Sequence, residues 1–198
     1  TSCITVVEDE VSSYSIILSG ASGERVILYE PGTNKHLHDA NFDKEMLQNV
    51  DWVYLNHIQE GSCIIQDDIS EMLATDSGPR LAWNPGGCQI DAGIQSHAEL
   101  LKHTELLIVN KEEALKLTET SSIEDALRAI LSTGASNVCI TDGGNGTVAS
   151  DGVNIYTCPV MENIEIVDTT GAGDAFGTGV TWGLMEGMIL PEALKTGS

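Results

Sequence analysis

Near its C-terminal end the chain reads Val167-Asp168-Thr169-Thr170-Gly171-Ala172-Gly173-Asp174-Ala175-Phe176-Gly177. The three small residues Gly171, Ala172 and Gly173 stand just before an apolar run typical of a helix, so their backbone N–H groups should be free donors at a helix N-terminus. Such an end attracts anions, because the helix macrodipole adds roughly half a positive charge there. Glycine also has no side chain to keep an anion away from the amides. The stretch therefore predicts an anion site at the start of a helix.

Asp174 falls in the first turn of the same predicted helix. A carboxylate beside a bound phosphate is electrostatically unfavourable unless it has a task, such as taking the proton of an attacking hydroxyl. A structural interpretation is also open, since Asp and Thr are ordinary helix-capping residues and a Gly-Ala-Gly turn can let a helix pack closely on a sheet. The short motif by itself leaves both interpretations standing.

The whole string from residue 168 to residue 176 resembles the C-terminal signature of the ribokinase-like, or PfkB, carbohydrate kinases. This resemblance implies that Asp174 is the catalytic base and that Gly171, Ala172 and Gly173 form the anion hole. Several relatives bind a monovalent cation beside that hole. By the same resemblance, Asp168 and Thr170 are the candidate ligands of a potassium ion.

Composition and charge exclude several classes of protein. The formal net charge is −21, with 30 acidic residues against nine Lys and Arg, which argues against binding to nucleic acid or to anionic membranes because both need a basic face. No apolar run approaches the roughly 20 residues of a membrane span. Five cysteines are scattered singly, which indicates reduced thiols and a cytoplasmic protein rather than a disulfide or metal framework.

The pattern of the chain predicts an α/β fold with a mostly parallel sheet and helices on both faces. Short β-rich runs separated by turns come first and indicate a small antiparallel sheet; from about Phe42 strands alternate with helices. The expected strands are Ile4–Val7, Tyr14–Leu18, Val26–Tyr29, Trp52–Leu55, Leu81–Trp83, Leu106–Val109, Val138–Ile140 and Thr147–Ser150. The expected helices are Ser62–Leu73, His97–Leu101, Lys111–Leu117 and Ile123–Leu131, besides the one after Gly173.

The resemblance covers essentially the whole chain and implies the ribokinase-like fold. Lid-type β-strands and the return to the core would occupy residues 1–40, and an α/β nucleotide-binding core would occupy residues 41–198. The family's first strand, its N-terminal Gly-Gly sugar-binding motif and its last helices have no counterpart in the sequence. We therefore expect one kinase domain, incomplete at both ends, and its expected partners include a second copy bound through the lid.

Asn110 and Glu113 follow the predicted strand Leu106–Val109 and open a helix. Asn110 can cap this helix while Glu113 acts as its capping-box partner, which is an adequate structural explanation. The resemblance implies instead an Asn-x-x-Glu motif, in which Asn110 binds ATP and Glu113 helps to hold Mg²⁺. Since Mg²⁺ keeps several of its waters, contact through water is the expected form.

The segment Thr141-Asp142-Gly143-Gly144-Asn145-Gly146 links two predicted strands. Its Gly-Gly and Asn-Gly pairs are ordinary hairpin turns. In the family a Thr-x-Gly-x-x-Gly loop lines the nucleotide, which implies that Thr141, Gly143 and Gly146 bind ATP. The turn Asn84-Pro85-Gly86-Gly87 follows another strand and is interpreted as structural.

Taken with the resemblance, these motifs predict an ATP-dependent phosphotransferase acting on a hydroxyl of a sugar or a sugar-like alcohol. A nucleoside kinase of the same fold and a non-catalytic sugar- or nucleotide-binding relative stay as alternatives. Retention of Asp174 with Asn110 and Glu113 counts against the non-catalytic relative. The chain lacks a Walker-type loop and a dinucleotide fingerprint, which disfavours a P-loop kinase and a nicotinamide-dependent oxidoreductase.

Overall fold

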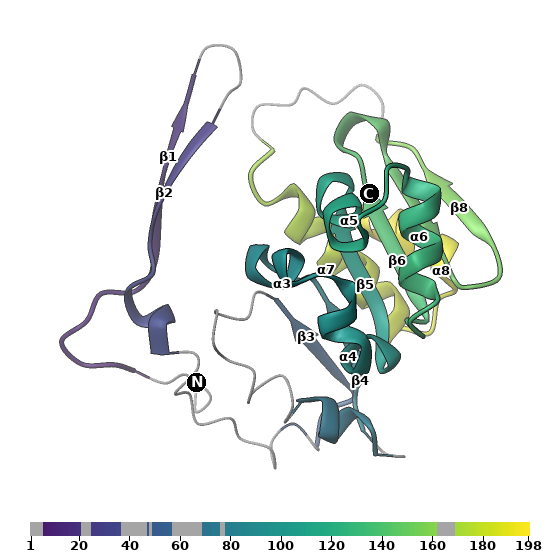
Figure 1. Ribbon diagram of the computed structural model, residues 1–198, viewed down its shortest axis with the longest axis horizontal. Coiled ribbons are helices and arrows are strands. Elements are labelled where there is room, and N and C mark those ends of the chain that lie inside the picture. The colour runs from purple at the N-terminus through teal and green to yellow at the C-terminus, as the bar shows by residue number, and fades with distance from the viewer. Residues whose placement is uncertain are drawn as a thin grey trace.

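The computed structural model describes residues 6–20, 25–36, 47, 49–56, 69–75, 78–161 and 169–198. These residues form a two-stranded sheet and a separate six-stranded sheet flanked by helices (Figure 1). The elements follow in the order β1 (Tyr14–Ser19), β2 (Arg25–Glu30), η1 (Gly32–His36), β3 (Trp52–Leu55), β4 (Arg80–Trp83), α3 (Gly87–Ala92), η2 (Ile94–His97), α4 (Ala98–Lys102), β5 (Thr104–Asn110), α5 (Lys111–Thr118), α6 (Ile123–Leu131), β6 (Asn137–Thr141), η3 (Gly143–Asn145), β7 (Thr147–Ser150), β8 (Ile155–Cys158), α7 (Ala172–Met185) and α8 (Leu190–Gly197).

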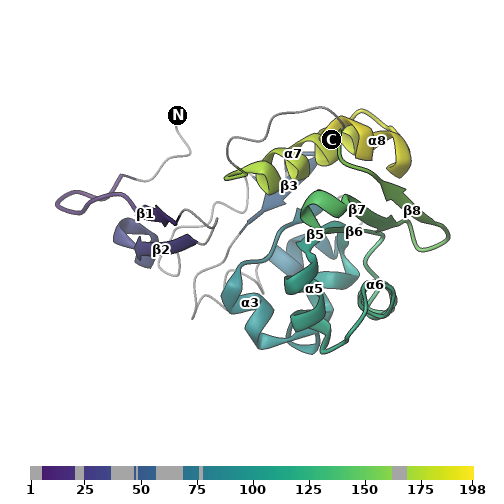
Figure 2. The same ribbon diagram turned by 90° about the horizontal axis from the view of Figure 1, so that it is seen from above.

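The larger sheet has the strand order β3-β4-β5-β6-β7-β8. Strands β3 to β6 run parallel, whereas β7 and β8 add an antiparallel edge. Helices α7 and α8 cover one face, and α3, α5 and α6 lie on the other (Figure 2). The predicted α/β class, with a mostly parallel sheet and helices on both faces, is confirmed.

Each face of the sheet buries its own apolar core. Strand β5 contributes to both, because Leu107 and Val109 face the α3–α6 side while Leu106 and Ile108 face α7 and α8. Burial on both faces explains the continuous apolar run in this strand. A fully buried Leu or Ile side chain stabilises the fold by about 1.5–3 kcal/mol relative to an exposed one, so the two cores hold the sheet in place beneath α7.

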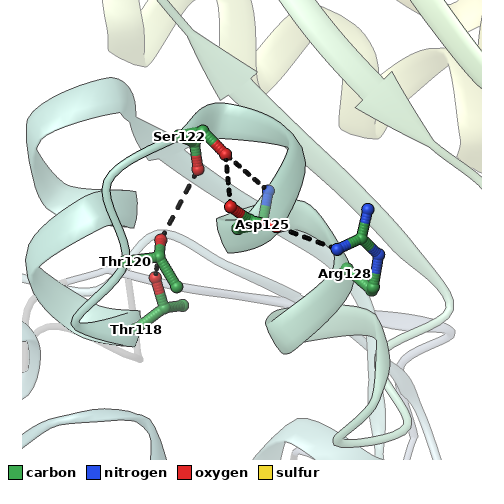
Figure 3. Close-up of polar contacts among 5 residues, drawn as sticks. All are labelled: Thr118, Thr120, Ser122, Asp125 and Arg128. Atoms are coloured by element: carbon green, nitrogen blue, oxygen red, sulfur yellow. Dashed lines mark hydrogen bonds and ion pairs between the residues drawn. The ribbon is translucent and has the colours of Figure 1, made fainter.

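The connection from α5 to α6 is held by a chain of side-chain hydrogen bonds (Figure 3). Ser122 caps α6 by accepting a bond from the backbone N–H of Asp125 (3.1 Å), and its hydroxyl donates to the Asp125 carboxylate (2.8 Å). Arg128 pairs with the same carboxylate at 2.8 Å. The Ser122 hydrogen bond first, and then Arg128, lower the pKa of Asp125. This capping explains why α6 begins where the sequence predicts.

The predicted strands and helices in the described part of the core are confirmed, with small shifts at their ends. Of the predicted helix Ser62–Leu73, only residues from 69 onward are described, and these are helical to Leu73. Residues 6 and 7 of the predicted strand Ile4–Val7 are not in a strand, and residues 4 and 5 lie outside the described part. The helix predicted at His97 begins one residue later, after η2.

Helices α3 and α8 and strand β8 were not predicted. Gly87, interpreted as part of a turn, is the first residue of α3. The Gly86 N–H donates to the Gln89 side chain (3.2 Å), and Gln89 and Ile90 are buried. Burial of this short segment outweighs the turn signal of its glycines, which is a tertiary effect that local propensity does not report.

Candidate active site

Helix α7 begins directly after a glycine in the left-handed conformation. Gly171 is the N-cap, with φ 79° and ψ −1°, a backbone geometry that residues with a side chain rarely adopt. The turn is closed by two backbone hydrogen bonds, from Ala172 N–H to the Thr169 carbonyl oxygen (3.1 Å) and from Ala175 N–H to the Gly171 carbonyl oxygen (2.9 Å). The prediction that a helix starts at Gly-Ala-Gly is thereby confirmed.

The described residues leave space around the glycines at this helix end. Within the described part of the chain, no atom lies within 4 Å of the place where a Cβ would stand on Gly171 or Gly173, apart from their own neighbours. Asp174 lies in the first turn and is exposed. The Ala172 N–H is used by its bond to Thr169, whereas the N–H groups of Gly173 and Asp174 have no carbonyl partner within the helix. An anion can therefore approach them beside the Asp174 carboxylate.

Gly177 lets α7 lie close to the sheet. A Cβ on Gly177 would stand 2.7 Å from the hydroxyl oxygen of Tyr54 in β3 and 3.1 Å from the Cδ1 atom of Ile108 in β5. Both distances are too short for a methyl group unless a neighbour moves. The start of α7 thus rests on side chains from two strands, which places Asp174 near the carboxyl edge of the sheet.

Four polar side chains mark the carboxyl ends of the parallel strands on the face that α7 covers. In each strand the polar residue comes two positions after a residue of the core beneath α7 and α8. Because successive side chains of a strand point to opposite faces, residues two positions apart point to the same face. They are Tyr54, Asn84, Asn110 and Thr141. In open α/β sheets ligands bind beyond this edge, so the fold brings the predicted residues Asn110 and Thr141 to the same region as the start of α7.

Asn84 joins neighbouring strands at this edge. Its side-chain N–H donates to the carbonyl oxygen of Ile108 in β5 (2.8 Å), and its backbone N–H donates to the carbonyl oxygen of Leu55 in β3 (2.9 Å). These bonds support the structural interpretation of the Asn84 turn.

Asn110 and Glu113 form a reciprocal capping box at the start of α5. The Asn110 side-chain oxygen accepts from the Glu113 N–H (2.9 Å), and the Glu113 Oε2 atom accepts from the Asn110 N–H (2.8 Å). The structural interpretation of this motif is therefore correct. One oxygen of the Glu113 carboxylate is not used by the capping bond, and Asn110 lies directly opposite Thr141 in the β5–β6 register.

The loop after β6 is tied to α5 by an ion pair that the sequence analysis missed. Lys111 Nζ lies 3.0 Å from Asp142 Oδ2, and Asn145 also donates to this oxygen (3.2 Å). The Lys111 hydrogen bond is the main cause that lowers the pKa of Asp142. The two residues are 31 positions apart, so no local pattern could have revealed the pair.

The glycines of this loop differ in their surroundings. Gly143 has φ +50°, and within the described residues nothing lies within 4 Å of the place of its missing Cβ. Gly146 has φ +87°, and a Cβ there would collide with the carbonyl oxygen of Cys158. Packing against β8 alone is enough to require glycine at 146, whereas Gly143 leaves the loop open to a ligand.

A cavity of about 640 Å³ lies beside β8 and α8. Its lining is mainly apolar and includes Cys158, Pro159, Leu194 and Lys195. The close approach of Gly146 to Cys158 and Pro159 connects the cavity to the loop after β6.

The predicted cation site is described only in part. Thr170 lies in the turn before α7, whereas Asp168 lies outside the described residues. Within the described residues, no group of three or more His, Cys, Asp or Glu side chains is placed to hold a metal ion.

In the same part of the chain, no helix is long and apolar enough to cross a membrane.

Comparison with known proteins assigns the chain to a family. The family model described as pfkB family carbohydrate kinase matches residues 1–198, and the chain belongs to this family. An uncharacterized sugar kinase of Archaeoglobus fulgidus is 24% identical over 191 residues, which cover 94% of this chain and 74% of that protein. A cytidine kinase of Thermococcus kodakarensis is 35% identical over 100 residues, half of this chain and 36% of that protein.

Solved structures show the same fold. A ribokinase from Thermotoga maritima superposes with a TM-score of 0.77 at 22% identity, over 95% of this chain and 61% of that one. An adenosine kinase from Sinorhizobium meliloti gives a TM-score of 0.79 at 22% identity, over 94% of this chain and 58% of that one. The chain thus spans about three fifths of the length of these two kinases. The predicted ribokinase-like fold is confirmed.

Proposed function

We propose that this chain forms the core of an ATP-dependent phosphotransferase that transfers the γ-phosphate to a hydroxyl of a sugar or a sugar-like alcohol. The observation that carries the proposal is the open start of α7, where Gly171, Ala172 and Gly173 lead into a first turn that exposes Asp174. Membership of a carbohydrate kinase family supports this class of reaction.

In this proposal Asp174 orients the acceptor hydroxyl and receives its proton. Phosphoryl transfer passes through a loose transition state in which the hydroxyl becomes acidic late, so a carboxylate base suffices. The amides of residues 171–173 and the dipole of α7 stabilise the negative charge that develops on the phosphoryl oxygens. A bound magnesium nucleotide supplies the phosphoryl group and part of the compensating positive charge.

The nucleotide is assigned to the neighbouring edge of the sheet. Asn110, Thr141, Gly143 and Gly146 are assigned to it, which is supported by the pairing of Asn110 with Thr141 across β5 and β6 and by the open space at Gly143. Glu113 fits magnesium through a bridging water, since one of its oxygens is left over from the capping box. A potassium ion held by Asp168 and Thr170 completes the proposal, and replacement of K⁺ by Na⁺ in the assay tests it.

The lid and the core are proposed as two functional parts, residues 1–40 and residues 41–198. Their separation is supported by the pairing of β1 and β2 with each other and with no other described strand. Eight apolar side chains of this hairpin are about half exposed: Tyr14, Ile16, Ile17, Leu18, Val26, Ile27, Leu28 and Tyr29. An isolated hairpin is marginal in water, so we assign it to a contact between two copies of the protein.

A nucleoside is the second candidate acceptor. The observation in its favour is the 35% identity with the cytidine kinase of Thermococcus kodakarensis over half of this chain. Both acceptors present an alcohol to the same base, so the roles of Asp174 and the α7 amides are unchanged.

The test is an ATP-consumption assay on the intact protein with panels of sugars and nucleosides. Asp174→Asn keeps the size of the side chain and should lower kcat by roughly a hundred- to ten-thousandfold, the usual contribution of a general base. Affinity for ATP should hold or improve, because a negative charge beside the phosphate has gone. Near-normal turnover in the variant would exclude Asp174 as the base, whereas no turnover by the wild-type protein with any acceptor would favour the non-catalytic relative.

A further inference from the structure

We propose that Tyr54 is a positioning residue for Asp174: its ring holds the first turns of α7 above the sheet, and its hydroxyl donates towards the Asp174 carboxylate through a bridging water. The inference rests on the proposed function, because it assigns a task to Tyr54 within the same site. Neither the sequence motifs nor the comparisons point to this residue.

The position of the tyrosine ring is set by the fold. Tyr54 stands on β3, on the face that α7 covers, and its hydroxyl oxygen lies 2.7 Å from where a Cβ of Gly177 would stand. Gly177 comes three residues after Asp174, and residues three apart lie on one side of a helix. The phenol therefore abuts α7 one turn from the Asp174 carboxylate.

The chemistry of the hydroxyl suits a donor. Burial first, and then the negative charge of Asp174, raise the pKa of Tyr54 above its ordinary value, so the phenol keeps its proton at any physiological pH. Tyr54 is still 38% exposed, so its side chain is not sealed inside the core. A carboxylate held by such a donor loses rotational freedom before the acceptor arrives, which is the usual gain from pre-organisation.

Kinetic measurements on the intact protein distinguish the role of the Tyr54 ring from that of its hydroxyl. Tyr54→Phe keeps the ring and removes the donor, so kcat should fall roughly ten- to hundredfold, the range expected for one hydrogen bond to a charged group. The KM for ATP should stay within about twofold, because α7 keeps its support. Tyr54→Leu removes the ring as well and should weaken ATP binding too.

Tyr156→Phe is the matched control. It removes a hydroxyl that donates to Asp151 at 2.7 Å in the β7–β8 hairpin, and it should leave kcat unchanged. An unchanged kcat in Tyr54→Phe, an equal loss in Tyr156→Phe, or a change confined to the KM for ATP would each overturn the inference.

The inference can also be tested without an activity measurement, by titration of the Tyr54 hydroxyl. The pKa of Tyr54, followed by NMR and assigned with Tyr54→Phe, should fall towards its ordinary value in Asp174→Asn and stay in place in Glu113→Gln. An unmoved pKa in Asp174→Asn would overturn the inference whatever the turnover. A shifted pKa in a protein that phosphorylates no acceptor would support the pairing of Tyr54 with Asp174 and reject the proposed function.

Discussion

Glycine serves two different purposes among the residues around the site. At Gly177 and Gly146 a side chain would meet Tyr54 or the backbone of Cys158, so these glycines are required by packing. At Gly171 the reason is the backbone conformation, with φ 79°, and at Gly173 the described structure leaves the space open. Of these four positions, only Gly173 has neither a packing nor a conformational reason for glycine, which makes it the sharpest residue for a test.

Gly173→Val should raise the KM for ATP of the intact protein and leave the sheet folded. The branched side chain would stand where phosphate oxygens approach the α7 amides, whereas its effect on the helix itself is small. Gly87→Val is the control, because Gly87 begins α3 and also has open space around its missing Cβ. An unchanged ATP titration in Gly173→Val would remove the anion site from α7.

Asp151 should make the protein more sensitive to acid. Backbone bonds from Asn154 and Val153 and the Tyr156 hydroxyl lower its pKa to about 2 from an ordinary value of 3.8. A folded-state pKa below the unfolded value adds stability above the unfolded pKa and loses it as the pH falls from about 4 to about 2.

Denaturant unfolding at pH 6 and at pH 3 checks this prediction. The wild-type protein should lose more of its free energy of unfolding between the two values than Asp151→Asn does. Because Asp151 is nearly at the surface, solvent screening makes the difference small. Equal pH dependence in the two proteins would contradict the assignment of the low pKa to Asp151.

At the scale of whole elements, the site depends on how helix starts meet strand ends. Helix α5 begins with a capping box that its own sequence encodes, and α7 begins with a glycine turn that its sequence also encodes. Their common location at the carboxyl edge depends on the parallel run of β3 to β6, and the bond from Lys111 to Asp142 joins the start of α5 to the loop after β6. Each helix start is encoded by its own segment, whereas the site depends on contacts between segments that are far apart in the chain.

The β1–β2 hairpin should hold two copies of the protein together. Ile16 lies opposite Leu28 in the register, and both are about half exposed. Leu28→Lys places a charge in this apolar face and should shift the protein towards monomer in sedimentation velocity experiments. Val153→Lys is the control, since Val153 is 87% exposed on a different loop. A wild-type protein that is monomeric at micromolar concentration would contradict the proposal.

For the whole molecule, the dominant electrostatic fact is the excess of negative charge. Acidic residues outnumber Lys and Arg by 30 to nine, and the net charge is −21. Repulsion among these negative charges destabilises the compact folded state. Salt weakens the repulsion, because the Debye length falls from about 10 Å at 0.1 M to about 3 Å at 1 M.

The melting temperature should therefore rise as sodium chloride is increased from 0.02 M to 1 M. A gain of about 1 kcal/mol would raise it by about 2–4 °C in a domain of this size. Differential scanning calorimetry checks the prediction, with a sucrose series as the control for effects of solutes that carry no charge. A melting temperature that stays flat or falls with salt would show that repulsion is not a significant term.

The sequence by itself determined the local elements and the main motifs. The capping box of Asn110 and Glu113, the glycine start of α7 and the alternation of strands with helices depend on residues within a few positions of each other. Such patterns act through the backbone of one segment, so they can be predicted without knowledge of the fold.

Only the tertiary structure decided which of these segments meet. The support of Gly177 by Tyr54 and Ile108, the ion pair of Lys111 with Asp142, and the burial that makes α3 a helix all join residues far apart in the chain or depend on a packed core. Contacts of this kind follow from how two cores close on the faces of one sheet. No local window of sequence contains that information, because side-chain burial is a property of the assembled layers.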